Sequence, residues 1–214
     1  MFYAGLVNPT RIIQEAINRK QIDLAYLIYQ QTEKRSNLSV VEQKALDSLK
    51  QAVKNLRYWQ LEKYLEAKQW QEADRETYHL IITNVGKENG ETLNEQDLHN
   101  FPCDDLLAID ELWIKHSNGL YGFSLQKDIY VECGGKLDFS YPNSKTWNKF
   151  CDRVAWRHGD NYVFYSDIFM NRFLSVKGHL PLISDYEGGE GRVELLLFSR
   201  IATCEMSILV NKFH

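Results

Sequence analysis

The sequence lacks the features that mark several common classes of protein. Lys and Arg (25) are outnumbered by Asp and Glu (29), and the formal net charge is −4, so no basic surface for nucleic acid is indicated. No window approaches the roughly 18 apolar residues of a membrane span. P-loop, G-x-S-x-G and H-E-x-x-H motifs are absent, which argues against P-loop nucleotidases, serine hydrolases of the α/β type and zinc peptidases.

The N-terminal residues carry no recognisable targeting segment. Met1–Lys20 contains Glu15 and no apolar core, unlike a secretory signal. It also lacks the long Ser- and Arg-rich composition of a transit peptide. We therefore expect the protein to act in the compartment where it is made.

Cysteine is scarce and scattered. The four cysteines are Cys103, Cys133, Cys151 and Cys204, with no C-x-x-C pair among them, so zinc and thioredoxin-like sites are not indicated. We expect reduced, mostly buried thiols. The six histidines have no metal-ligand spacing either, and no metal site is predicted.

Apolar residues recurring at helical spacing run through most of the chain and predict an all-α protein. Residues 1–54 are expected to form a small helical subdomain, in which Pro9 opens a first helix. Ser39 and Glu42 have the spacing of a capping box at the start of a later helix. Residues 55–214 form the second expected domain.

Within the second domain, predicted helices alternate with breaks marked by Gly and Pro. Ser124 is the expected cap of one helix, and Asn143 or Ser144 that of the next. Residues 161–192 have weak periodicity and are expected to be partly irregular. The apolar segment Val193–Cys204 fits a buried helix or a strand, and the helices before it favour a helix.

One acidic cluster is the strongest candidate for acid–base chemistry. It comprises Asp104, Asp105, Asp110 and Glu111, and a carboxylate pair of this kind serves in general acid–base catalysis. Negative charge at a helix N-terminus explains Asp104 and Asp105 equally simply, because the helix dipole favours it. We prefer the second interpretation for these two.

Three motifs in fixed order are more informative. They are I-D-x-L-W over residues 109–113, S-N-G-x-x-G-F-S-x-Q over residues 117–126 and G-H-L-P over residues 178–181. Together they resemble the "genomes uncoupled four" family of tetrapyrrole-binding activators of magnesium chelatase in oxygenic phototrophs. The resemblance runs from about residue 58 to residue 206.

The resemblance implies an all-α domain shaped like a cupped hand, whose apolar palm holds protoporphyrin IX or Mg-protoporphyrin IX, and in some members a linear bilin. It implies no catalytic residues and no required cofactor. The implied partner is the large, porphyrin-binding subunit of magnesium chelatase, with no nucleic acid. A monomer, with peripheral membrane association, is expected in the plastid stroma (plastid-encoded) or the cyanobacterial cytoplasm.

The residue chemistry suits a porphyrin, whose flat π-face needs apolar lining and whose two propionates need cationic or main-chain donors. The predicted ligand-binding residues are Trp113, Ile114, Phe123, Gln126, Tyr130, His179, Leu180, Pro181 and Arg200. Core packing is an alternative for Trp113 and Phe123, and a surface charge for Arg200. For His179, shaping of its loop is favoured over magnesium ligation or a propionate contact.

The chain departs from the family pattern in several respects. It ends at His214 without the longer tail of plant relatives, so regulation through such a tail is not expected, and its N-terminal subdomain is shorter than in many cyanobacterial relatives. Asp185–Gly191 gives the implied cover loop an acidic, Gly-rich character, which does not favour propionates. Two rival functions stay open: a helical adaptor using the palm as a protein-binding groove, and a bilin-handling enzyme.

Overall fold

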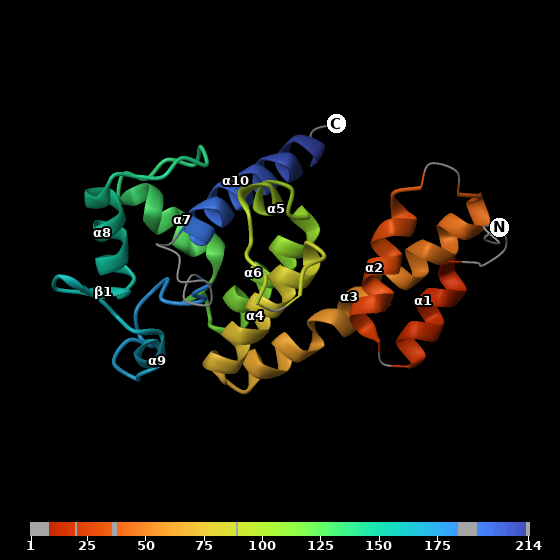
Figure 1. The fold of residues 1–214 in the computed structure, drawn as a ribbon, viewed down its shortest axis with the longest axis horizontal. Helices are drawn as coiled ribbons and strands as arrows, with labels where there is room; N and C mark the ends of the chain where they lie inside the picture. The colour runs from red at the N-terminus through yellow and green to blue at the C-terminus, as the bar shows by residue number, and fades with distance from the viewer. Residues whose placement is uncertain (1–8, 20, 36–37, 89, 184–191, 213–214) are drawn as a thin grey trace. The chain divides into compact units, whose positions relative to one another are not determined.

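The computed structural model describes residues 9–19, 21–35, 38–88, 90–183 and 192–212. Nearly all regular structure in these ranges is helical (Figure 1), which confirms the all-α prediction. The described ranges contain one small sheet, an antiparallel hairpin of β1 (Arg157–His158) and β2 (Asn161–Tyr162). The chain divides into two compact units, Met1–Gln60 and Leu61–His214.

The first unit contains α1 (Pro9–Asn18), α2 (Ile22–Glu33) and most of α3 (Val40–Glu66). The predicted capping box is present, because Glu42 N donates to Ser39 Oγ (3.3 Å) and Ser39 N donates to the Glu42 carboxylate (2.9 Å). The core of this unit consists of Ile13, Ala16, Ala25, Tyr26, Tyr29, Leu46 and Val53.

Helix α3 is longer than the apolar pattern indicates. The expected domain boundary after residue 54 and the observed division after Gln60 both fall inside it. The sequence of α3 has neither Gly nor Pro, so nothing in it breaks the main-chain hydrogen bonds of the helix. The helix ends just before Lys68, which has a positive φ of 55°, and α4 then begins at Trp70.

The second unit contains the remaining helices. These are α4 (Trp70–Asn84), α5 (Glu95–His99), α6 (Cys103–His116), α7 (Phe123–Glu132), α8 (Ser144–Arg153), α9 (Tyr165–Ile168) and α10 (Arg192–Lys212). The apolar segment Val193–Cys204 lies within α10, so the preference for a helix is confirmed. Helix α10 packs against α5, α6 and α7. In the described part of the expected irregular stretch, residues 161–183, the regular structure consists of β2 and α9.

Aromatic rings form much of the core of the second unit. Phe150 of α8 lies at the centre, with ring-centroid distances of 5.7 Å to Tyr130, 5.2 Å to Trp147, 5.3 Å to Trp156 and 5.5 Å to Phe198. All of these rings are at most 5% exposed. The cluster therefore ties α7, α8 and α10 together by burial of large apolar surfaces.

One of the two predicted caps is found and the other is wrong. Asn143 caps α8, because its side chain accepts a hydrogen bond from Thr146 N (3.0 Å). Ser124 lies inside α7, where its N–H donates to Asp110 Oδ1 (2.9 Å). A carboxylate from α6 thus caps the N-terminus of α7, where a side chain at the start of the helix itself is the usual cap. Burial raises the pKa of Asp110.

A glycine makes this junction of α6 and α7 possible. Gly122 has a φ of +142°, and a Cβ there would lie 2.8 Å from Ile114 Cγ1 and 2.9 Å from Asp110 Oδ1. Only a residue without a side chain allows so close an approach. Asp104 and Asp105 occupy the first turn of α6, as the helix-dipole interpretation predicts.

The expectation of reduced thiols is wrong for two cysteines. Cys103, the first residue of α6, forms a disulfide with Cys204 of α10 across 101 residues of sequence. Cys133 and Cys151 are free and buried, as expected. The pairing could not be inferred from spacing because it depends on how α6 and α10 pack.

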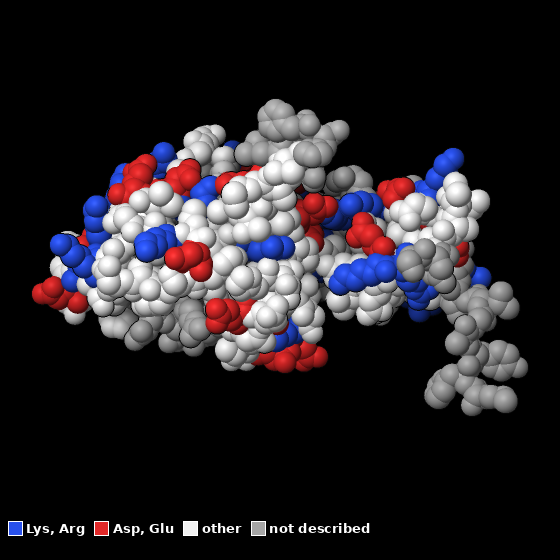
Figure 2. All heavy atoms as spheres, turned by 90° about the horizontal axis from the view of Figure 1, so that it is seen from above, with Lys and Arg blue, Asp and Glu red and all other residues white. Residues whose placement is uncertain are grey.

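The surface carries charges of both signs, interspersed over the face that Figure 2 shows. None of the helices in the described ranges combines the length and the apolar character that a bilayer crossing requires.

Candidate functional site

The G-H-L-P motif begins a segment without regular secondary structure, residues 178–183, which is held by hydrogen bonds from several helices. Gln126 of α7 donates from Nε2 to the carbonyl oxygens of Gly178 (2.9 Å) and Pro181 (2.8 Å). Its own Oε1 is buried and has no hydrogen-bond partner among the described residues. Gly122 N donates to the carbonyl of Leu180 (3.0 Å). The structure therefore brings together predicted residues from two separate motifs.

Buried carboxylates hold the end of the same stretch. Asp74 of α4 accepts from Leu182 N (2.7 Å) and from the Tyr165 hydroxyl (2.8 Å), and Glu194 of α10 accepts from Ile183 N (2.9 Å). Both carboxylates are 0% exposed. Buried acids are retained where they satisfy main-chain donors, so these two residues position the stretch.

Sequence reasoning missed both acids, although one of them left a detectable signal. Asp74 follows Trp70 by one helical turn, on the same apolar stripe as Ala73 and Thr77. A carboxylate on a buried stripe indicates a specific partner. Glu194 lies in a short apolar run at the start of α10. An acidic residue at this position is explained by the helix dipole alone, so the sequence gives no sign of a buried partner.

His179 is enclosed within the fold. Its Nδ1 lies 2.7 Å from the carbonyl oxygen of Val154 and its Nε2 lies 2.8 Å from that of Ile168, while Trp156 Nε1 donates to the main-chain oxygen of His179 (2.7 Å). The residue is 0% exposed. This geometry matches the favoured role of shaping the loop, and neither nitrogen is directed at solvent.

We expect His179 to make the fold less stable in acid. Burial lowers the pKa of His179 below its usual 6.5, against the smaller opposing effect of the two carbonyls. Between the folded and the unfolded pKa, the unfolded chain binds a proton that the folded chain does not, so the free energy of unfolding falls as the pH drops below 6.5. The slope is at most about 1.4 kcal/mol per pH unit for one proton. Urea unfolding at pH 7.5, 6.5 and 5.5 measures it.

The matched control replaces an exposed histidine. His158→Asn, at the exposed end of β1, should keep the wild-type slope, whereas His179→Asn should flatten it. Identical slopes in both variants would assign the acid sensitivity to other groups.

Trp113 belongs to a second aromatic cluster. It is 0% exposed, its ring lies 6.1 Å from those of Trp70 and Tyr121, and its Nε1 donates to Thr77 Oγ1 (2.9 Å). The Tyr121 hydroxyl donates to a main-chain oxygen, and burial raises the pKa of Tyr121 to about 12. In this structure Trp113 presents no surface to a ligand.

The other predicted palm residues differ in how accessible they are. Phe123 is 0% exposed and Tyr130 is 1% exposed. Pro181 and Leu180 are buried as well, whereas Ile114 is half-buried next to Gly122. Their contact with a ligand stays a prediction. The acidic Asp185–Gly191 part of the cover loop lies outside the described residues.

Among the predicted ligand-binding residues, Arg200 has a charged side chain with hydrogen-bond donors left for a ligand. It is half-buried on α10, and its Nε donates to the main-chain oxygen of Phe101 (2.8 Å). Neither Nη nitrogen has a hydrogen-bond partner in the described part of the chain. Burial lowers the pKa of Arg200, but a guanidinium keeps its charge at neutral pH. The side chain is therefore oriented by one bond, with donors left for an anion.

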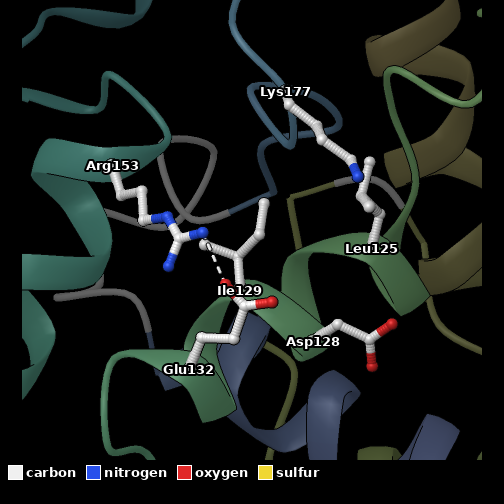
Figure 3. A pocket seen from close by; sticks show the side chains of 6 residues that line it. All are labelled: Leu125, Asp128, Ile129, Glu132, Arg153 and Lys177. Carbon is white, nitrogen blue, oxygen red and sulfur yellow. Dashed lines mark ion pairs between the residues drawn. The ribbon is translucent and has the colours of Figure 1, made fainter.

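A separate cavity of about 200 Å³ lies beside α7 (Figure 3). It is lined by Leu125, Asp128, Ile129, Glu132, Arg153 and Lys177. Figure 3 shows Arg153 paired with Glu132 (2.5 Å) and the Lys177 side chain extending towards Leu125. The volume is below the roughly 300–1,000 Å³ of small-molecule pockets, and no predicted ligand-binding residue lines it.

One further group of side chains has the composition of a metal site. Glu62, Glu66 and His116 place their ligand atoms within 4.8 Å of one another. Both carboxylates already have cationic partners, because Lys115 donates to Glu62 (2.9 Å) and Lys63 to Glu66 (2.6 Å). These ion pairs account for the cluster without a metal.

Comparison with known proteins decides the family. Residues 51–197 match the sequence profile described as GUN4-like. The chain belongs to the GUN4-like family. This is the family that the three sequence motifs indicate, and the match covers all of them.

Two curated relatives illustrate the similarity. The chain is 33% identical over 135 residues to the chloroplastic tetrapyrrole-binding protein of Arabidopsis thaliana, covering 60% of this chain and 49% of that one. It is 28% identical over 140 residues to the ycf53 protein of Pyropia yezoensis, covering 64% and 54%. The chain thus spans about half the length of these curated relatives.

Solved structures agree with the fold. Ligand-free GUN4 of Arabidopsis thaliana matches with a TM-score of 0.51 at 28% identity, covering 66% of this chain and 91% of that one. GUN4 of Chlamydomonas reinhardtii matches with a TM-score of 0.51 at 26% identity, covering 68% and 86%. The helical second unit is therefore a GUN4-type domain.

Proposed function

We propose that this GUN4-like protein binds a tetrapyrrole without transforming it. The ligand is protoporphyrin IX or Mg-protoporphyrin IX, with a linear bilin as a further ligand. The loaded protein stimulates magnesium insertion by the porphyrin-binding large subunit of magnesium chelatase, in a plastid or a cyanobacterial cell.

The main support for this proposal is the family match over residues 51–197. The Arabidopsis relative that is named for tetrapyrrole binding is 33% identical over 135 residues. Fold alone does not give function, so the residues must also suit the ligand. Arg200 supplies a partly desolvated cation whose Nη donors have no partner among the described residues.

Titration of the purified chain tests the proposal directly. Protoporphyrin IX, Mg-protoporphyrin IX and biliverdin are added separately, while the Soret band and Trp fluorescence are recorded. We expect saturable red shift and quenching with the porphyrins, and mass spectrometry of the released ligand should find it unchanged. A chemically altered ligand would indicate the bilin-handling enzyme, and absence of any binding would favour the adaptor.

Arg200 provides a sharper test of where the ligand binds. We expect Arg200→Ala to weaken protoporphyrin IX binding about 10- to 100-fold, as for a charge-assisted hydrogen bond of about 1.5–3 kcal/mol. Arg200→Glu should weaken it further, because it adds repulsion of the propionates in a partly dry site. Both variants should bind protoporphyrin dimethyl ester nearly normally, since the ester has no carboxylate.

Lys177→Glu at the separate cavity is the matched control. It makes the same type of charge change as Arg200→Glu, and we expect wild-type affinity for both ligands. Equal losses for free acid and ester in the Arg200 variants would indicate a disturbed fold. If Lys177→Glu alone weakened the free acid, the propionates would be bound at the cavity of Figure 3 instead.

Chelatase stimulation requires its own assay. Magnesium insertion by the reconstituted chelatase subunits should accelerate when the porphyrin-loaded chain is added, and Arg200→Glu should reduce this gain at sub-saturating porphyrin. A chain that binds porphyrin but leaves the rate unchanged would be a carrier with another recipient.

A further inference from the structure

Two links join the start of α6 to the same side of α10. Cys204 is bonded to Cys103, and Arg200, one helical turn earlier on α10, donates to the carbonyl of Phe101 (2.8 Å). Residues four apart on a helix face the same way. The disulfide therefore lies next to the cation that the proposed function assigns to the ligand.

The disulfide is exposed to chemistry on one side only. Cys103 is half-buried at the first position of α6, whereas Cys204 is 0% exposed. Of the two residues only Cys103 has exposed surface, so we take its Sγ as the atom that an incoming thiolate attacks, with Cys204 as the leaving group. The two free cysteines are poor competitors in such an exchange, because both are buried, and burial raises the pKa of Cys151, which keeps it a thiol.

We infer that Cys103 and Cys204 form a redox switch that sets the affinity of the tetrapyrrole site through the position of Arg200. This inference rests on the proposed function. In the oxidised chain, the covalent bond fixes α10 against the start of α6 and holds the guanidinium in place. In the reduced chain, only non-covalent contacts hold α10 there, so Arg200 is less well ordered. Part of the binding free energy is then used to order its side chain, and the affinity for the ligand is lower.

The switching reaction is ordinary thiol–disulfide exchange with a dithiol reductant. The first reductant thiolate bonds to Cys103 Sγ, the Cys103–Cys204 bond breaks, and Cys204 leaves as a thiolate that takes up a proton. The second reductant thiol then attacks the mixed disulfide. Two electrons and two protons pass to the protein, which gains two thiols, and the reductant becomes a disulfide.

The test compares one protein in two redox states. The full chain is titrated with protoporphyrin IX after oxidation with oxidised dithiothreitol, after reduction with dithiothreitol, and after re-oxidation. We expect reduction to raise the Kd by about 5- to 150-fold, the usual range of coupling between two sites, and re-oxidation to restore it. The dimethyl ester should respond much less.

Variants assign the effect to the proposed pair. Cys103→Ser/Cys204→Ser should bind like the reduced chain whether or not dithiothreitol is present. Cys133→Ala/Cys151→Ala, which leaves the disulfide intact, should keep the full redox response. A Kd that is equal in both redox states would overturn the inference and leave the proposed function standing, whereas absence of binding in both states would overturn the proposed function itself.

Two further outcomes would also overturn the inference. Equal losses for free acid and ester on reduction would exclude the route through Arg200. Loss of helical circular dichroism on reduction would make the disulfide a purely structural bond.

Discussion

Replacing Phe150 with alanine is expected to lower the free energy of unfolding of the second unit by about 3–5 kcal/mol. The ring is 0% exposed and contacts four other aromatic side chains from α7, α8, α10 and the turn before β1. Its removal leaves a cavity that rigid neighbouring rings cannot fill, so the lost transfer free energy and the cavity cost add. Native domains are stable by only about 5–15 kcal/mol, so this one change removes a large share.

Urea unfolding followed by Trp fluorescence measures the effect. Trp147 and Trp156 lie in the cluster, so the signal reports on this unit. We expect a lower urea midpoint with an unchanged m-value. Phe164→Ala is the control, because that ring is 77% exposed and its loss should change stability by no more than about 0.5 kcal/mol. Similar small losses in both variants would show that the cluster contributes little.

Loss of the disulfide is expected to have the second-largest effect. Replacing Cys103 and Cys204 by serine should lower the free energy of unfolding by about 2–5 kcal/mol. The bond closes a loop of about a hundred residues, with a sequence separation of 101. In the chain-entropy account, a long loop restricts the unfolded state strongly. Urea unfolding of the oxidised wild type and the double variant provides the comparison.

Reductant supplies the internal control for this experiment. Dithiothreitol should bring the wild type to the stability of the double variant and should leave the variant unchanged. A stability difference below about 1 kcal/mol would contradict the chain-entropy account for this disulfide.

Local features of the fold could be predicted from the sequence, because they depend on neighbours a few residues away. The capping box of Ser39 and Glu42 and the cap at Asn143 are both present. The helical character of Val193–Cys204 followed from its context. The three motifs also identified the family, which the match over residues 51–197 confirms.

Features that depend on distant packing could not be predicted. Asp110 caps α7, which begins 13 residues later, and Cys103 forms a disulfide with Cys204, 101 residues away. Asp74 binds the main chain at Leu182. Each of these pairings exists only after α4, α6, α7 and α10 have packed, and no local spacing encodes it.

The structure shows where the predicted site residues lie, while their contact with a ligand stays a prediction. Gln126, Leu180 and Pro181 do come together, and Arg200 does hold a partly exposed cation on α10. Trp113 and His179 are both 0% exposed, which fits core packing for Trp113 and the favoured role of loop shaping for His179. Sequence patterns identify apolar positions, but a palm-lining ring and a core ring have the same pattern.

The hydrogen bond from Ile183 N to Glu194 (2.9 Å) has a consequence for how this chain tolerates changes of length. It fixes the two ends of the intervening segment close together, independently of what lies between them. For a segment closed in this way, doubling its length costs only about 0.6 kcal/mol of closure entropy. A change in the number of residues between Ile183 and Glu194 is therefore expected to cost little stability, provided that this hydrogen bond is kept.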